Sequence, residues 1–289
     1  MISPSHLAAA LLCVASLHAQ DTAACPRLDL TELRELPQKT QHVLAEFPAG
    51  KQGEEALKYF LFPPDPAQKA PGEKFPLVVV LHHAGAERDL GAVLTMNPES
   101  IGLWLEPAFR KSHPSYVLVP WSGGHHWESG DWHKASPMSA SPTGNSAAVL
   151  RLIGVMRDRL PIDPSRIYLV GQSMGAFGVW DLVSRRPELF AAAIPVCGGG
   201  DPVQAPHLKN LPIWTFHGEA DEIIPVERTR KMAEAITALG ASHFTYTEYK
   251  EASHDRCSEQ AFTEPDLATW LFRQKKLAVR ENLIRNPGE

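Results

Sequence analysis

Short apolar runs alternate with amphipathic stretches from about residue 75 onward, and this alternation is typical of a parallel sheet covered by helices. The run Leu77-Val78-Val79-Val80-Leu81 is apolar at every position, which favours a strand buried on both faces. Runs of the same kind predict the other central strands. The expected set is 77–81, 116–119, 167–170, 191–196, 213–216 and 244–249.

Apolar residues recur at three- and four-residue spacing between these runs, with Pro or Gly near the ends of each stretch. This spacing predicts crossover helices over 145–160, 174–186, 226–239 and 265–276. Residues 57–62 predict an outer strand, and the proline-rich segment 63–76 predicts an exposed connection. The expected fold class is therefore α/β, with a mostly parallel central sheet, helices on both faces and a single domain.

The composition is consistent with that fold and narrows the partners. The chain has 289 residues, of which 44% are hydrophobic and 21% charged, so one domain can bury a full core. The formal net charge of -5 leaves no basic face for nucleic acid or for an anionic membrane. We expect neither nucleic-acid binding nor stable membrane insertion.

Residues 7–17 form an apolar stretch followed by the small residue Ala19, which predicts a secretory signal peptide and export to the periplasm or beyond. The stretch is too short to span a bilayer. No Lys or Arg precedes it, so a frayed N-terminal helix is the alternative. The expected division is a signal peptide at 1–19, an N-terminal extension with outer strands at 20–74, a catalytic core at 75–276 and a tail at 277–289.

Cysteines are sparse, so the fold must depend on its hydrophobic core and not on a disulfide framework. Cys197 and Cys257 both follow strand ends that are expected at the same edge of the sheet, which makes them the candidate pair for one bridge. Free thiols are an equally open interpretation.

The segment 121–143 follows a strand and lacks the periodicity of a helix or strand. Irregular loops of this length are usually functional, and the aromatic content argues against disorder. We expect it to form a wall of a binding cleft, with Trp121, Trp127 and Trp132 contacting substrate. Its three histidines have no acidic or cysteine partner at a suitable spacing, so we predict no metal site.

Gly171-Gln172-Ser173-Met174-Gly175 matches the pattern G-x-S-x-G and lies between a predicted strand and a predicted helix, the context of a nucleophile elbow. The glycines are needed because side chains at these positions would collide with neighbouring strands. The start of the helix then lies under the serine, where its dipole favours developing negative charge. Ser173 is the predicted nucleophile.

A serine hydroxyl is a weak nucleophile and needs a base that is itself oriented by an acid. Asp221 enters the turn after the strand 213–216 and is the preferred acid. Glu219 and Glu222 are alternatives that fit better as solvated loop charges.

His254 lies where a strand gives way to a helix beyond the acid, which is the position of the base in the order serine, acid, histidine. Its rivals are His217, which fits better as a packed residue at a strand end, and His243, which begins a strand. Asp255 fits a helix start, because adjacent residues rarely direct their side chains at each other.

An oxyanion hole completes such a site, and one donor is expected from the backbone N–H after the nucleophile, that of Met174. The loop in Leu81-His82-His83-Ala84-Gly85 supplies the second donor, for which the Ala84 amide is preferred and the His83 amide is the alternative. Loss of one such donor typically costs about 3 kcal/mol of transition-state stabilisation.

These segments together resemble the secreted esterase branch of the α/β-hydrolases, which includes feruloyl and acetyl-xylan esterase-like enzymes, polyhydroxybutyrate-depolymerase-like enzymes and predicted peptidases related to the prolyl oligopeptidase family. The resemblance spans about residues 75–272. It implies Ser173, Asp221 and His254 as the triad and the Ala84 and Met174 amides as oxyanion donors. The segments that carry it are 81–85, 166–175, 197–201 and 217–225.

One position departs from the resemblance, because the family usually has His-Gly where this chain has His82-His83. If the position of His83 requires a positive φ, backbone strain follows. Three consequences of a bulky His83 beside the oxyanion loop are open: a narrower acyl pocket, an extra donor near the substrate, or no effect on the site.

The function expected from these residues is hydrolysis of carboxylic esters through an acyl-Ser173 intermediate, with no cofactor and no metal. The resemblance and the tryptophan-rich loop favour small-molecule or oligosaccharide esters, such as feruloyl or acetyl esters. A serine peptidase of the prolyl oligopeptidase-like type is the alternative enzyme, and a non-catalytic carbohydrate-binding module is the alternative of another class.

Overall fold

The computed structural model describes residues 42–50, 56–68, 70, 72–86, 89–95, 98–127 and 137–276. The predicted signal peptide at 1–19, the tail at 277–289 and the predicted substrate contact Trp132 lie outside the described residues.

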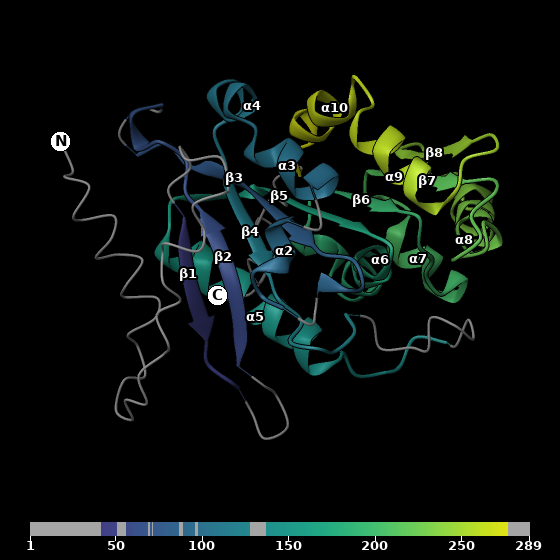
Figure 1. The fold of residues 1–289 in the computed structure, drawn as a ribbon, viewed down its shortest axis with the longest axis horizontal. Coiled ribbons are helices and arrows are strands. Elements are labelled where there is room, and N and C mark those ends of the chain that lie inside the picture. The colour runs from purple at the N-terminus through teal and green to yellow at the C-terminus, as the bar shows by residue number, and fades with distance from the viewer. Residues whose placement is uncertain are drawn as a thin grey trace, which may run out of the picture.

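The described part of the chain forms an eight-stranded sheet in the order β1-β2-β4-β3-β5-β6-β7-β8 (Figure 1). The strands from β3 to β8 run parallel to one another, and β2 is antiparallel to both of its neighbours, β1 and β4. The strands are β1 Val43–Phe47, β2 Leu57–Phe62, β3 Phe75–Leu81, β4 Tyr116–Pro120, β5 Ile162–Gln172, β6 Ala192–Val196, β7 Ile213–Gly218 and β8 Phe244–Tyr249.

The sheet separates two hydrophobic cores, because successive side chains of a strand point to opposite faces. In β3, Leu77, Val79 and Leu81 belong to one core, and Val78 and Val80 belong to the other. Every residue of β3 is buried, as expected for a strand covered on both sides.

Helices cover both faces of the sheet (Figure 1). The core that contains Leu77 is closed by α5 Gly144–Arg159, α6 Met174–Arg185, α7 Ala205–Leu208 and α8 Glu227–Ala238. The other core is closed by α2 Ala92–Thr95, α3 Pro98–Leu105, α9 His254–Phe262 and α10 Leu267–Arg273, and α4 Pro107–Ser112 packs beside α3. Three short 3-10 helices are η2 Pro66–Gln68, η4 Pro187–Leu189 and η5 Pro202–Gln204.

The predicted fold class is confirmed, and each predicted central strand and crossover helix is present with ends shifted by a few residues. Residues 57–62 form β2 as predicted, but β1 pairs outside it, so β2 is not the edge strand. No helix in the described ranges is long and apolar enough to cross a membrane.

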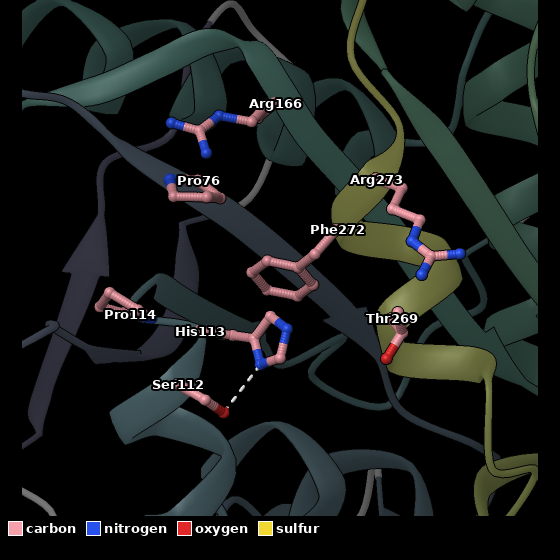
Figure 2. A pocket seen from close by; sticks show the side chains of 8 residues that line it. All are labelled: Pro76, Ser112, His113, Pro114, Arg166, Thr269, Phe272 and Arg273. Atoms are coloured by element: carbon pink, nitrogen blue, oxygen red, sulfur yellow. Dashed lines mark hydrogen bonds between the residues drawn. The ribbon is translucent and has the colours of Figure 1, made fainter.

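The parallel strands place their carboxyl ends at one edge of the sheet, which is where open α/β sheets bind their ligands. The predicted site residues all follow such strand ends, after β3, β4, β5, β7 and β8. A surface pocket of about 350 Å³ opens at the opposite edge, near the amino ends of β3 and β4. In it the rings of His113 and Phe272 lie next to each other in an edge-to-face arrangement (Figure 2), with centroids 5.0 Å apart. None of the predicted site residues lines that pocket.

Leu152 of α5 is completely buried in the core, so removing its side chain leaves a cavity under the sheet. We expect Leu152→Ala to lower the free energy of unfolding by about 2 to 5 kcal/mol. The control is Val203→Ala, since Val203 is 78% exposed and its truncation should change stability by no more than about 0.5 kcal/mol. Denaturant unfolding of both variants tests the assignment, and equal effects would contradict it.

Candidate active site

Ser173 is the single residue between β5 and α6, and its backbone adopts φ 56 and ψ -121. A non-glycine residue in this region is strained, and such strain is concentrated at functional sites. The Ser173 amide donates to the Val196 carbonyl at 2.8 Å, which fixes the turn against β6. The Ser173 side chain makes no capping hydrogen bond to α6, so its hydroxyl is not used to cap the helix.

The two glycines of the G-x-S-x-G turn are required by close backbone contacts. A Cβ on Gly175 would lie 2.1 Å from the Leu81 carbonyl oxygen, and a Cβ on Gly171 would lie 2.5 Å from the Gly175 carbonyl oxygen. Both distances are far shorter than any carbon–oxygen contact allows. The glycines therefore let the first turn of α6 press against the end of β3, so the serine turn and the loop after β3 are neighbours.

Asp221 follows β7, and its side chain is completely buried. The amides of Ile223 and Ile224 donate to Oδ1 at 2.9 and 2.8 Å. Oδ2 accepts from His254 Nδ1 at 2.7 Å and lies 3.2 Å from His217 Nε2. Burial opposes ionisation, but the hydrogen bonds from His217, His254 and the Ile224 amide outweigh it and hold the pKa of the carboxyl well below its usual range.

His254 is the first residue of α9, and its side chain is only 6% exposed. Ser253 is the N-cap of this helix, and its side chain accepts a hydrogen bond from the Arg256 amide. An ionised carboxylate can only accept, so the hydrogen-bond pattern assigns the proton of the His254 ring to Nδ1, which faces Asp221. Nε2 is then the nitrogen that can take up a proton.

The acid and base segments lie against each other because Gly218 has no side chain. A Cβ on Gly218 would lie 2.2 Å from the Ala252 carbonyl oxygen. The same carbonyl accepts from the Ala220 amide at 3.1 Å, and the Glu219 amide donates to the Tyr249 carbonyl at 2.9 Å. These contacts set the position of Asp221 relative to the start of α9.

The serine turn is connected to this pair through the residue after β6. Cys197 follows Val196, the partner of the Ser173 amide, and its thiol contacts the His254 carbonyl oxygen at 3.7 Å. The Cys197 sulfur, a carboxylate oxygen of Asp221 and a ring nitrogen of His254 lie within 4.8 Å of one another. Ser173 follows β5, Asp221 follows β7 and His254 follows β8, so all three lie at the carboxyl edge of the sheet.

Four of the rival residues named from the sequence are exposed, whereas His217 is buried and lies 3.2 Å from Asp221 Oδ2. Glu219 is exposed and accepts from the Glu251 amide at 3.1 Å, and Glu222 is exposed. His243 precedes β8, and its carbonyl accepts from the Ile213 amide, which places it at the amino ends of the strands. Asp255 is exposed in the first turn of α9.

The three atoms grouped around Cys197 are a poor metal site. A thiol must lose its proton to ligate a metal, and burial raises the pKa of the Cys197 thiol well above its ordinary value. The Nδ1 nitrogen of His254 is already bonded to Asp221. These residues do not fit a metal, and we assign none to them.

Cys197 and Cys257 are both buried free thiols in this structure, so the candidate disulfide between them is not formed. Cys197 adopts a positive φ of 52, at the end of the strand where it contacts α9.

The loop after β3 is held by His82, which is completely buried. Its Nε2 accepts from the Ser122 amide at 3.2 Å, and its Nδ1 therefore donates to the His83 carbonyl at 2.8 Å. The Trp127 indole donates to the His82 carbonyl at 3.1 Å. Ala84 lies exposed at the turn that this framework supports.

The departure at His83 brings no backbone strain, because the positive φ of this loop falls on Gly85, at 98. The His83 ring is half-buried, and its Nδ1 lies 2.5 Å from the Ala84 carbonyl oxygen. The residue therefore reaches the predicted oxyanion turn without distorting it. The other predicted donor, the Met174 amide, belongs to the first residue of α6 and has no partner within that helix.

Two tryptophans of the segment after β4, Trp121 and Trp127, support the loop after β3. Trp127 is completely buried, and a Cβ on Gly178 of α6 would lie 2.4 Å from its own Cβ. Trp121 is half-buried and donates through its indole to the Ala86 carbonyl at 3.1 Å. This corrects the expectation that Trp127 contacts substrate, because its ring packs under the loop and exposes no surface.

Comparisons with known proteins place this arrangement in a wider group. A model of the Dienelactone hydrolase family matches residues 140–268. Poly(3-hydroxyalkanoate) depolymerase C of Paucimonas lemoignei is 29% identical over 126 residues, which are 43% of this chain and 28% of that protein. A thermostable esterase of known structure is similar with a TM-score of 0.72 and 32% identity, over 81% of this chain and 63% of that chain.

A ferulic acid esterase structure is similar over 81% of this chain and 99% of its own, with a TM-score of 0.52 and 14% identity, which bears on the fold alone. These likenesses agree with the mostly parallel eight-stranded sheet of this chain. The chain has the α/β-hydrolase fold. It spans less than two thirds of the length of the depolymerase and of the thermostable esterase.

Because Gly175 lies against the end of β3, we expect that the protein does not tolerate a side chain at position 175. Gly175→Ala should lower the free energy of unfolding by about 1 to 3 kcal/mol, because a backbone oxygen must move. Gly154→Ala in α5 is the matched control, since a Cβ there meets nothing within 4 Å. That substitution should stabilise the protein by about 0.5 to 1 kcal/mol. Denaturant unfolding gives both values, and a stabilised Gly175→Ala would contradict the packing described here.

The depressed pKa of Asp221 predicts a pH dependence of stability. A carboxyl whose folded pKa lies below its unfolded value of about 3.9 stabilises the fold above that pH, and the stabilisation is lost as the pH falls toward the folded pKa. The stability difference between wild type and Asp221→Asn should therefore shrink below about pH 4. Urea unfolding at several pH values measures it.

Asp255→Asn is the control for that measurement, because it removes an exposed carboxylate beside His254. It should retain the acid-dependent loss of stability of the wild type. A stability difference for Asp221→Asn that is constant down to about pH 2 would contradict the assignment of a buried, ionised carboxylate.

Proposed function

We propose that this α/β-hydrolase hydrolyses carboxylic esters through an acyl-serine intermediate on Ser173, with His254 as its base and Asp221 as the acid that orients the base. The observation that carries the proposal is the buried hydrogen bond of 2.7 Å from His254 Nδ1 to Asp221 Oδ2 at the edge of the sheet where the strained Ser173 turn lies. A neutral imidazole held in this way presents Nε2 as the proton acceptor that a serine hydroxyl needs.

Acylation is the first step of the proposed reaction. Ser173 Oγ attacks the ester carbonyl carbon while His254 Nε2 takes the hydroxyl proton, and the carbonyl becomes a tetrahedral oxyanion. The amides of Met174 and Ala84 are the proposed donors to that oxygen. The intermediate collapses, the bond to the alcohol oxygen breaks, and the imidazolium returns its proton to the leaving alcohol.

Deacylation repeats these roles with water as the nucleophile. His254 takes one proton from the water, the hydroxide attacks the acyl-serine carbonyl, and the Ser173 oxygen leaves with the proton from the imidazolium. The products are a carboxylic acid, an alcohol and the regenerated serine. Asp221 stays ionised throughout and stabilises the charged imidazole.

The proposed substrates are small-molecule or oligosaccharide esters, with feruloyl or acetyl esters as the first candidates. The names of two similar proteins support ester substrates, since one is a thermostable esterase and the other is a poly(3-hydroxyalkanoate) depolymerase. Half-buried Trp121, whose indole donates to the Ala86 carbonyl, and half-buried His83, whose ring contacts the Ala84 carbonyl, are the proposed substrate contacts within the described residues.

The alternatives receive less support. A serine peptidase would use the same three residues, and the similar proteins compared above are named for esters or for a lactone. A non-catalytic carbohydrate-binding module has no need for a strained serine turn or for an ionised aspartate buried against a histidine. We also propose export, because the apolar stretch at 7–17 has the pattern of a signal peptide.

The first test is a rate assay of wild type and Ser173→Ala on short p-nitrophenyl esters, a feruloyl ester, an acetylated xylan oligosaccharide and a peptide anilide. We expect wild type to cleave at least one ester class and Ser173→Ala to lose at least about 10³-fold in kcat with unchanged folding. His254→Ala should lose as much, because the nucleophile and base act as a unit.

Labelling with a fluorophosphonate provides an independent measurement, since it reports a reactive serine without the correct substrate. Wild type should be labelled on Ser173, and Ser258→Ala, which removes a buried serine beside His254, should still be labelled. A folded wild type that resists labelling and cleaves none of the esters would favour the binding module. Cleavage of the anilide alone would favour the peptidase.

A further inference from the structure

His217 lies beneath the proposed acid, in a position that the catalytic roles described above do not use. It is the penultimate residue of β7, four residues before Asp221, and its ring is completely buried. Sequence analysis treated it as a weaker rival for the base and expected it to pack or to form hydrogen bonds at a strand end. Its contacts give it a more specific role.

Each nitrogen of the His217 ring has a defined partner. Nε2 lies 2.9 Å from the Ile224 carbonyl oxygen and 3.2 Å from Asp221 Oδ2. Nδ1 lies 2.7 Å from the Thr229 hydroxyl, and that hydroxyl lies 2.7 Å from the Gly198 carbonyl oxygen.

These partners determine where one proton of the ring must be. A carbonyl oxygen and an ionised carboxylate can only accept hydrogen bonds, so an Nε2 without a proton would place three acceptors together in a buried site. The Thr229 hydroxyl has one proton, which it can donate to Gly198 or to His217 Nδ1. In the first case His217 carries a proton on both nitrogens, and in the second case it carries one on Nε2 alone. The Nε2–H is present in both.

Asp221 Oδ2 consequently lies between two imidazoles, His254 on one side and His217 on the other. His217 is fixed by the β7 backbone and by Thr229 of α8 at its far nitrogen. The other charged group near it is Glu248, opposite His217 in the register of β7 and β8, and that carboxylate is paired with Arg230 at 2.6 Å. The Nε2–H therefore faces the carboxylate of Asp221 and the Ile224 carbonyl.

We propose that His217 is a positioning residue, which holds the Asp221 carboxylate by its Nε2–H in the one orientation that accepts from His254 Nδ1. The proposal rests on the proposed hydrolase function for its consequence in catalysis. Its structural part, the proton on Nε2 and the bond to Asp221, does not require that any particular substrate has been identified.

Two amide variants separate the two ends of the ring. His217→Gln places an amide nitrogen near the position of Nε2 and keeps a donor for Asp221, whereas His217→Asn reaches only the position of Nδ1 and leaves Asp221 without that donor. Both variants are neutral, polar and smaller than histidine. The residue does not contact substrate, so KM should remain within about 3-fold of wild type.

We expect His217→Asn to lower kcat by about 10- to 100-fold, as misplacement of a reacting group by a fraction of an ångström does, and His217→Gln to recover most of that loss. In an Asp221→Asn background the substitution His217→Asn should change kcat by less than about 2-fold, since the two residues act through one hydrogen bond. Independent losses that multiply in the double variant, or equal losses in the Gln and Asn variants, would overturn the proposal.

A second measurement uses the wild-type protein, so it does not depend on whether a variant folds. Long-range ¹H–¹⁵N spectra of protein labelled at histidine report which ring nitrogens carry protons, and His217 should be protonated at Nε2 from about pH 6 to 9. An unprotonated Nε2 in this range would overturn the proposal even if ester hydrolysis is observed. A protonated Nε2 in a protein that cleaves no ester would support the structural part while the proposed function failed.

Discussion

The buried carboxylate of Asp221 is the constraint around which the carboxyl edge of the sheet is organised. An ionised carboxylate removed from water costs several kcal/mol unless donors replace the lost solvent. Four donors converge on it, two from the following backbone and two from imidazole rings. To bring them together, the chain has to turn tightly after β7 and has to lack a side chain at Gly218, where the carbonyl of Ala252 approaches. The start of α9, and with it His254, is positioned as a result.

The loop after β3, which carries the proposed oxyanion donor Ala84, depends on a second set of directional contacts, and these come from a different part of the chain. His82 accepts from the Ser122 amide, and the indoles of Trp121 and Trp127 donate to the carbonyls of Ala86 and His82. Hydrogen bonds from the segment after β4 therefore hold the loop after β3, while the Leu81 carbonyl contacts Gly175 at the start of α6. The proposed donors are the amides of Ala84, in the loop after β3, and Met174, at the start of α6. These two segments pack against each other at Leu81 and Gly175, so their positions are linked.

Much of this could be predicted from the sequence, because the signals are local. The central strands are continuous apolar runs, and the serine turn and its two glycines form a compact motif in the correct context. β1 has no such signal, since four of its five residues are only half-buried. The contacts of Trp127 and His217 could not be predicted. The sequence pattern around a loop tryptophan or a histidine at a strand end is the same whether its side chain faces substrate, the core or another polar group. Their roles depend on long-range packing that sequence spacing does not encode.

The parallel arrangement of β3 to β8 has a consequence for how the site comes into being. The loops at this edge follow different parallel strands and no two of them form one hairpin, so contacts between the loops join segments that are far apart in the chain, as with residues 81 and 175, 127 and 178, or 221 and 254. Contacts of high sequence separation form late, because loop-closure entropy must be overcome first. During refolding, secondary structure can therefore form well before the site does. The site forms only when the parallel strands that carry its residues have assembled into the sheet.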